Sequence, residues 1–202
     1  MTRFLRCWQK EVGAEAVQPT DFGVTIPATD PRLPRSLRDF HVAKAQIRFR
    51  SLYEQSNPGT ERYADPRALV PFKQFSEADF SNWKSAFAGM NEPDASYFRY
   101  DRSQQGFRER DLDSMLVAGA ETGGAFYLLI PRNTTRDGES EALFLHHGGL
   151  VSRYKSFAHL LASLYLEERE RFAGRDPSLG HLYYFPGRLG ETCVSHVIDT
   201  SM

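Results

Sequence analysis

The chain has 202 residues, of which 41% are hydrophobic and 13% aromatic, and its formal net charge is −1. This composition predicts a folded chain with a packed core and excludes an intrinsically disordered one. The charge is uneven, at +4 over residues 1–50 and −5 over residues 51–202. An acidic C-terminal part would favour contact with a basic partner.

The sequence holds two cysteines, Cys7 and Cys193. Two cysteines in a chain of this length are not a disulfide framework, so we expect a reducing, cytoplasmic setting. Residues 1–12 lack the apolar run of a signal peptide, and no stretch approaches the roughly 20 apolar residues that span a bilayer. We therefore expect a soluble protein with no membrane partner, and with Cys7 near a mobile end.

The N-terminal half mixes helices with a connector. Residues 1–16 predict a short helix, and residues 17–34 contain four prolines and a glycine and predict an extended connector. We divide the chain there, into an N-terminal helix and connector (1–34) and a single domain (35–202). A helix then opens near Ser36, either through a capping box with Asp39 or with Pro34 as its first residue. Its apolar spacing predicts that it continues through Tyr53.

The C-terminal half reads mainly as strands. Alternation and turn residues predict strands at 96–101, 114–118, 125–130 and 142–146, then a helix capped by Ser156, then a hairpin of residues 182–185 and 192–198. A further helix is predicted after Ser76. This order predicts an α+β fold with a mainly antiparallel sheet of about five to six strands packed against helices.

Residues with metal or catalytic chemistry do not converge in this pattern. The His146–His147 pair, and Cys193 with His196, fall on predicted strands at spacings that point their side chains to opposite faces. Nucleotide-binding glycine loops and the nucleophile elbow are absent from the sequence. The basic residues between 32 and 50 fit a solvated helix face better than a nucleic-acid surface. We therefore expect no metal, no cofactor, no nucleic-acid partner and no enzymatic activity.

Acidic and aromatic residues gather between positions 92 and 113. They are Asp94, Tyr97, Asp101, Glu109, Asp111 and Asp113. Tyrosine is a common interface anchor, so the cluster as a whole suggests an acidic surface for a protein partner. Each residue alone has a simpler interpretation, with Tyr97 packed in the sheet and the acids solvated in loops. Solvated turn charges also explain Glu109, Asp111 and Asp113 better than a cation site does.

Arg153 and Tyr154 allow two interpretations. Arg153 could pair with Glu139 or Glu141 and pin the preceding loop to the start of the helix. Alternatively, these four residues could face a partner. Both interpretations remain open from the sequence.

A longer pattern spans residues 126–161 and resembles the SUKH superfamily, which includes many bacterial immunity proteins and a yeast cell-wall synthesis regulator. Many bacterial members carry L-L-N-P at the end of a strand, then G-E-W-E-A-W, then G-x-x-R-Y-x-S-F-x-x-L leading into a helix. The matching residues here are Leu128, Leu129, Pro131, Gly138, Glu139, Glu141, Ala142, Gly149, Arg153, Tyr154, Ser156, Phe157 and Leu160. Ile130 replaces the asparagine, and Ser140 and Leu143 replace the tryptophans.

A second match lies earlier, where Leu33, Pro34, Leu37 and Phe40 fit the L-P-x-x-[YL]-x-x-F entry of SUKH proteins. The family usually continues into an Asn-Gly-Gly loop, whereas a longer helix is expected here. The resemblance implies a SUKH-like fold and an immunity protein that binds and neutralises a cognate bacterial toxin, with nucleases among the possible toxins. The partner would be that toxin, and the protein would be a monomer or weak homodimer. The alternative is an intracellular interaction scaffold or regulator without a toxin partner.

Overall fold

The structure is a computed structural model. It describes residues 1–13, 17–19, 33–47, 73–74, 91, 93, 97, 108, 110–111, 116–121, 125–135, 137–145, 151–172 and 193–198.

A five-stranded antiparallel sheet forms one layer of the molecule, in the order β3-β4-β5-β6-β7. Its strands are β3 (Lys73–Gln74), β4 (Leu116–Glu121), β5 (Ala125–Thr134), β6 (Ser140–Leu145) and β7 (Val151–Tyr154). A second sheet pairs β1 (Val17–Pro19) with β2 (Ala45–Ile47).

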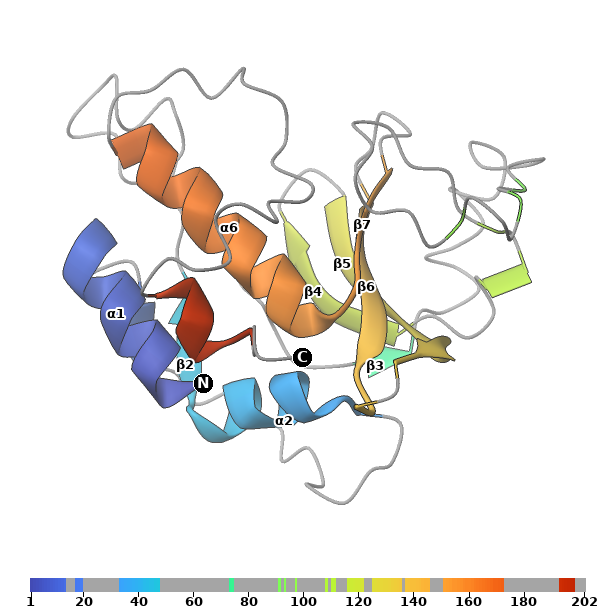
Figure 1. Cartoon of the computed structure of the whole chain (residues 1–202), viewed down its shortest axis with the longest axis horizontal. Coiled ribbons are helices and arrows are strands. Elements are labelled where there is room, and N and C mark those ends of the chain that lie inside the picture. Colours follow the sequence, from blue (N-terminus) through green and yellow to red (C-terminus); the bar gives the residue numbers. More distant parts are fainter. Residues whose placement is uncertain are drawn as a thin grey trace.

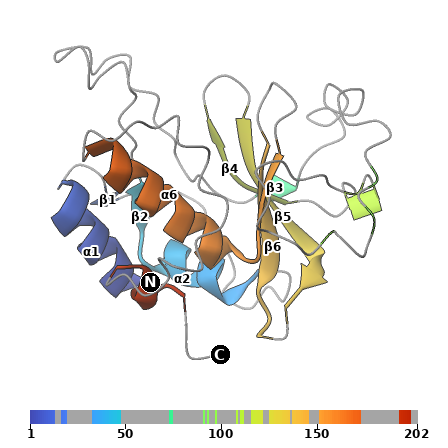
Figure 2. The ribbon, with the colours of Figure 1, turned by 45° about the horizontal axis from the view of Figure 1, so that its top comes forward.

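The helices are α1 (Thr2–Val12), α2 (Arg35–Val42) and α6 (Phe157–Phe172), with a short 3-10 helix, η5 (Val194–His196). They lie to one side of the five-stranded sheet (Figure 1, and after rotation Figure 2). The expected α+β arrangement is confirmed. None of the helices in the described part of the chain is long and apolar enough to cross a bilayer.

The core forms where α1 packs against α6. Phe4 and Trp8 lie one turn apart on α1 and both meet Tyr165 edge to face, with ring centroids 5.8 and 5.6 Å away. Phe4, Trp8 and Tyr165 are fully buried, in the same cluster as Phe157 of α6. The boundary at residue 34 stays a prediction, but α1 shares its core with the rest of the described chain.

Strands β6 and β7 are buried on both faces. Ala142 pairs with Tyr154, and both join the core cluster on the α6 side. Leu143 pairs with Arg153, and because side chains alternate along a strand, these two point to the opposite face. Leu143 and Arg153 are each only 1% exposed, so this second face is also covered.

Helix α2 is shorter than the apolar spacing predicts. It ends at Val42, the chain turns through Lys44 at a φ of 47°, and β2 begins at Ala45. Ile47 then pairs with Val17 and is fully buried, so strand pairing overrides the helical periodicity. The prediction of a helix continuing past this point is therefore wrong at residues 43–47, and residues 48–53 lie outside the described part.

Other secondary-structure elements also differ from the sequence-based predictions. Residues 193–198 contain η5, not a strand, and Tyr97 is helical, since its N–H donates to the Pro93 carbonyl at 2.9 Å. Strand β7 was not predicted. The helix after Ser156 is confirmed as α6, with the Ser156 hydroxyl accepting the His159 N–H at 3.2 Å as its N-cap. The predicted helix after Ser76, the strand 182–185 and the His146–His147 pair lie outside the described residues.

A disulfide joins Cys7 of α1 to Cys193, with the two Cα atoms 5.5 Å apart. The prediction that Cys7 lies near a mobile end is therefore wrong, and the single cysteine pair forms a bond that the expectation of a reducing setting did not anticipate. The apolar stripe of α1 explains the bond. Because Phe4 and Trp8 of α1 are buried against α6, Cys7 on the same helix lies next to the segment that precedes η5. The link spans 186 residues and ties the N-terminal helix to the C-terminal part of the fold.

We expect that reduction of this bond in the presence of a metal chelator lowers the free energy of unfolding substantially. For a separation of 186 residues, chain entropy alone predicts about 5 kcal/mol as an upper value. Urea denaturation followed by far-UV circular dichroism, with and without reductant, measures the change. Equal midpoints in both conditions would show that the link contributes nothing to stability.

Candidate functional site

A buried network of charged and polar side chains lies on the sheet face away from α6. The ring of Tyr97 is fully buried between two guanidinium groups, with the Cζ atoms of Arg108 and Arg153 lying 3.7 and 3.8 Å from its centroid. Both distances suit cation–π attraction to the two faces of one ring. Arg153 also donates from Nη2 to the Tyr97 carbonyl at 2.5 Å. Tyr97 is thereby attached to strand β7.

Two carboxylates balance the two guanidinium groups. Arg153 Nη1 donates to Glu141 Oε1 at 2.9 Å, and Arg108 Nε donates to Asp111 Oδ2 at 2.8 Å. The side chains of Glu141 and Arg153 are each 1% exposed. Because burying an unpaired charge costs a large free energy, each of the two requires the other. The expected pairing of Arg153 is confirmed, with Glu141 as its partner.

Asn133 of β5 connects the two ion pairs. Its carbonyl oxygen accepts from Arg108 Nη2 at 2.8 Å, while its Nδ2 donates to Glu141 Oε2 at 2.6 Å. Only this orientation of the amide presents an acceptor to the guanidinium and donors to the carboxylate. The sequence analysis did not select Asn133 or Arg108. The spacing of Arg108 and Asp111, three residues apart within a charged turn, was the only local signal.

Burial dominates the electrostatics of this network. It raises the pKa of the Tyr97 hydroxyl, and the nearby Glu141 carboxylate raises it further, so the hydroxyl stays protonated and donates to Glu141 Oε2 at 3.0 Å. Burial also raises the pKa of Glu141, while the charge of Arg153 opposes that rise. The arrangement is a buried structural network with little exposed surface for a substrate.

The structure changes the interpretation of the candidate interface residues. Tyr97, Asp111, Glu141 and Arg153 are drawn together, but inside the protein, and Glu139 and Tyr154 are buried nearby. These six residues are each at most 9% exposed, which favours a structural role for them over direct contact with a toxin. The other candidates, Asp94, Asp101, Glu109 and Asp113, lie outside the described residues.

Glu139 connects the β5–β6 loop to α2. Ser36 donates from its backbone N–H to Oε1 at 2.8 Å and from its hydroxyl to Oε2 at 2.5 Å. Pro34 occupies the N-cap of α2 and supplies no side-chain cap, so a carboxylate from 103 residues away takes that role. Both predicted starts of this helix are therefore wrong: Ser36 bonds to Glu139 and not to Asp39, and the first helical residue is Arg35, with Pro34 as the N-cap. Gly138, at a φ of 79°, makes the turn that delivers Glu139.

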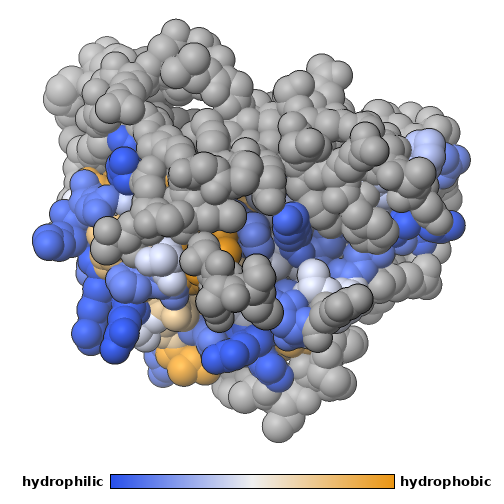
Figure 3. Space-filling view, in the orientation of Figure 1, coloured by the Kyte–Doolittle hydropathy of each residue, from blue (hydrophilic) through white to orange (hydrophobic). Residues whose placement is uncertain are grey.

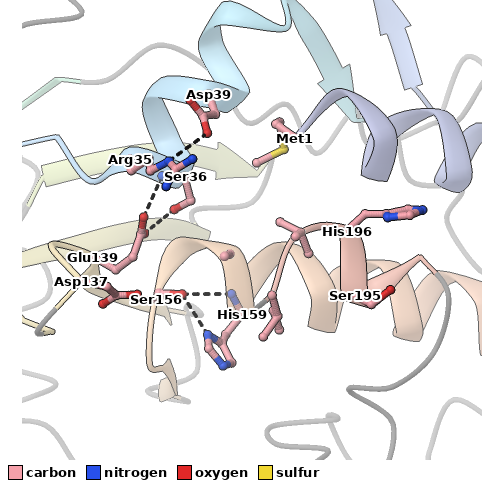
Figure 4. Close-up of a pocket in the computed structure, with 13 residues that line it drawn as sticks. Met1, Arg35, Ser36, Asp39, Asp137, Glu139, Ser156, His159, Ser195 and His196 are labelled. Carbon is pink, nitrogen blue, oxygen red and sulfur yellow. Dashed lines mark hydrogen bonds and ion pairs between the residues drawn. The ribbon is translucent and has the colours of Figure 1, made fainter. Parts of the chain in front are cut away.

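A cleft of about 530 Å³ opens beside this contact. Its walls come from the start of α1, the start of α2, the β5–β6 loop, the first turn of α6, and η5 (Figure 4). Asp39 and Asp137 are exposed at the cleft, and Arg35 lies 3.7 Å from Asp39. Glu139 and Ser156 are buried at its base.

Ser156 and His159 in this cleft resemble a nucleophile and its base. Their Oγ and Nδ1 atoms lie 2.9 Å apart. However, Ser156 is 4% exposed, and its oxygen already accepts the His159 N–H as the cap of α6. Burial, reinforced by the charge of Lys155, lowers the pKa of His159 to about 4, well below the range near 7 that suits a general base. The pair fits a helix cap better than a catalytic dyad.

Comparison of the chain with protein-family models, with curated proteins and with solved structures found no match.

The Glu141–Arg153 pair gives a stability prediction. Arg153→Met leaves a buried carboxylate without its cation, so we expect a loss of about 3–5 kcal/mol in the free energy of unfolding. The double variant Glu141→Leu/Arg153→Met removes both charges and should cost less than the sum of the single variants. Asp39→Asn, which breaks a pair whose side chains are 79% and 49% exposed, is the control and should cost less than about 1 kcal/mol. Additive single-variant losses in urea denaturation would contradict the coupling.

His159 gives a pH prediction. Its pKa falls from 6.5 to about 4 on folding, so the unfolded chain binds a proton in this range that the folded chain does not. The contribution of His159 is complete above pH 6.5 and is lost as the pH falls towards 4. Replacing it in His159→Gln should reduce the stability difference between neutral pH and pH 4.5 by about 2 kcal/mol. Equal pH dependence of the two proteins in urea denaturation would count against a buried neutral imidazole.

Proposed function

We propose that this chain is an immunity protein that binds and neutralises a cognate bacterial toxin, with no chemical step of its own. In this proposal it has a SUKH-like fold and acts in the cytoplasm as a monomer or weak homodimer. The surface of a preformed scaffold occludes the active site or the substrate path of the toxin. A specific interface of this kind buries roughly 1,600 Å² and depends on a few anchor residues.

The observation that carries the proposal is the structural use of the residues that resemble the superfamily. Gly138 turns the β5–β6 loop, Glu139 caps α2, Glu141 pairs with Arg153, and Ser156 caps α6. These residues stabilise the scaffold from within, so the identity of the residues on its outer surface can vary. In a family whose members share a scaffold but bind different toxins, the shared motif residues would be buried and the residues that contact the toxin would lie on a variable surface.

The cleft is the part of the described surface that we assign to the toxin. Asp39 and Asp137 are exposed there, and Arg35 lies 3.7 Å from Asp39. His159 is neutral because burial lowers its pKa. The described residues on the face shown in Figure 3 are mainly hydrophilic, which suits a polar interface with a basic partner more than an apolar one.

The decisive experiment uses the toxic C-terminal domain encoded by a neighbouring open reading frame. We expect co-expression of this chain to restore growth of cells that express the toxin domain, and the purified proteins to form a complex in a binding titration. A toxic neighbour that this chain neither binds nor inhibits would overturn the proposal.

A charge-reversed variant then tests the position of the interface. Asp39→Lys/Asp137→Lys should weaken the complex at least tenfold, with a larger effect at low salt, because like charges then face the basic partner. Arg6→Gln, on the exposed side of α1 and outside the cleft, is the control and should leave the affinity within about twofold. Unchanged affinity in the double variant would move the interface elsewhere while leaving the immunity function intact.

A further inference from the structure

Three metal-ligating side chains converge at the junction of α1 and η5. Cys7 and Glu11 lie four residues apart on α1, so their side chains project from the same face of the helix. Cys193 meets them from the residue that precedes η5. The two sulfur atoms and a carboxylate oxygen of Glu11 all lie within 4.8 Å of one another. Ligand atoms around one tetrahedral zinc ion require separations of this order.

We propose that Cys7, Glu11 and Cys193 form a redox-gated site for a thiophilic divalent cation, with Zn²⁺ as the reference ion. In the oxidised protein the two sulfurs are joined as a disulfide and the site is closed. In the reduced protein the two thiolates and the carboxylate bind the ion, and water completes a tetrahedron. The connection between α1 and η5 is thereby kept in either redox state, covalently in one and through the metal in the other.

A dithiol can reduce the Cys7–Cys193 disulfide in two exchange steps. A thiolate of the dithiol attacks the Cys7 sulfur, which is the more accessible because Cys7 is half-buried while Cys193 is 1% exposed. The S–S bond breaks, Cys193 leaves as a thiolate and takes up a proton, and the second thiol of the dithiol then displaces Cys7. Two electrons and two protons have moved to the protein, and the dithiol has become a disulfide. Binding of Zn²⁺ then releases the two thiol protons.

The carboxylate is already oriented for this role. Tyr165 donates its hydroxyl hydrogen to Glu11 Oε2, and Arg169 Nη1 lies 3.9 Å from the same oxygen. Neighbours that hold a ligating carboxylate in this way fix its orientation at metal sites. Tyr165 belongs to the packed core, and Arg169 follows one turn later on the same helix. Glu11 is therefore positioned by the fold as well as by α1.

His196 is the nearest candidate for a fourth ligand in the sequence. The 3-10 turn places it three residues after Cys193, a spacing that would put both on one side of such a helix. The prediction that Cys193 and His196 lie on one strand, with their side chains on opposite faces, is therefore wrong. Nevertheless, the ring nitrogens of His196 do not join the three atoms that converge within 4.8 Å in the described part of the chain. We accordingly assign the fourth position to water.

Anaerobic metal titration tests the proposal. The full chain is reduced with dithiothreitol, freed of reductant by gel filtration, and titrated with Co²⁺ and then Zn²⁺. We expect one equivalent of Co²⁺ to bind with a thiolate-to-metal charge-transfer band, and Zn²⁺ to displace it. The unreduced protein should show no such band, and excess Mg²⁺ should not compete, because it prefers oxygen ligands.

Matched variants separate the site from nonspecific binding. Glu11→Gln retains both cysteines and should weaken Zn²⁺ binding at least about tenfold, whereas Asp137→Asn, a carboxylate of the β5–β6 loop, should leave it unchanged. If reduction unfolds the chain, one equivalent of Zn²⁺ should restore the native circular dichroism. A reduced wild-type chain that binds no Co²⁺ through sulfur, or that Zn²⁺ fails to refold, would overturn the proposal. Equal affinity of the wild-type and Glu11→Gln proteins would remove Glu11 from the site.

Discussion

The described sheet depends on the buried ion pair between Glu141 and Arg153. It lies on the face opposite α6, where an apolar side chain would have been easier to desolvate, and it is only 1% exposed. Its geometric requirements explain its neighbours: the remaining Glu141 oxygen needs the donors of Tyr97 and Asn133, and the second guanidinium nitrogen needs the Tyr97 carbonyl. A single displaced partner would leave a charge or dipole unsatisfied, so the network specifies one arrangement of the residues that cover the sheet.

The same constraint extends from the sheet to α2 through the β5–β6 loop. Glu139 directly precedes β6 and Glu141 lies within it, and their carboxylates bind different partners, Ser36 of α2 and Arg153 of β7. Displacing the loop would therefore disturb a helix cap and a buried ion pair together. The Cys7–Cys193 link adds a third connection, because it fixes α1 and η5, both of which contribute walls to the cleft.

The sequence was most informative where one local rule decided the outcome. The apolar stripe of α1, the Ser156 cap and the strands on either side of the β4–β5 turn follow from periodicity and turn chemistry, and they are present. The end of α2 failed because pairing of Ile47 with Val17 is a contact between distant residues, which helical spacing cannot reveal. The disulfide and the Glu139 cap were inaccessible for the same reason, with partners 186 and 103 residues away.

For the candidate site, the sequence predicted which residues come together better than it predicted what they do. The sequence pointed to Tyr97, Asp111, Glu141 and Arg153, which do meet, but it left open whether they build the fold or face a partner, because acidic and aromatic residues are also typical of interfaces. The two arginines reverse that interpretation: they neutralise the acids and enclose the tyrosine ring, so the cluster can be buried without an uncompensated charge. In the proposed function, a partner surface would use residues that the network leaves exposed. At the cleft these include Asp39 and Asp137, which lie on α2 and on the β5–β6 loop, the two elements that the Glu139–Ser36 contact joins. For the toxin interface proposed above, rigidity of the elements behind the cleft would reduce the entropic cost of ordering the surface on binding.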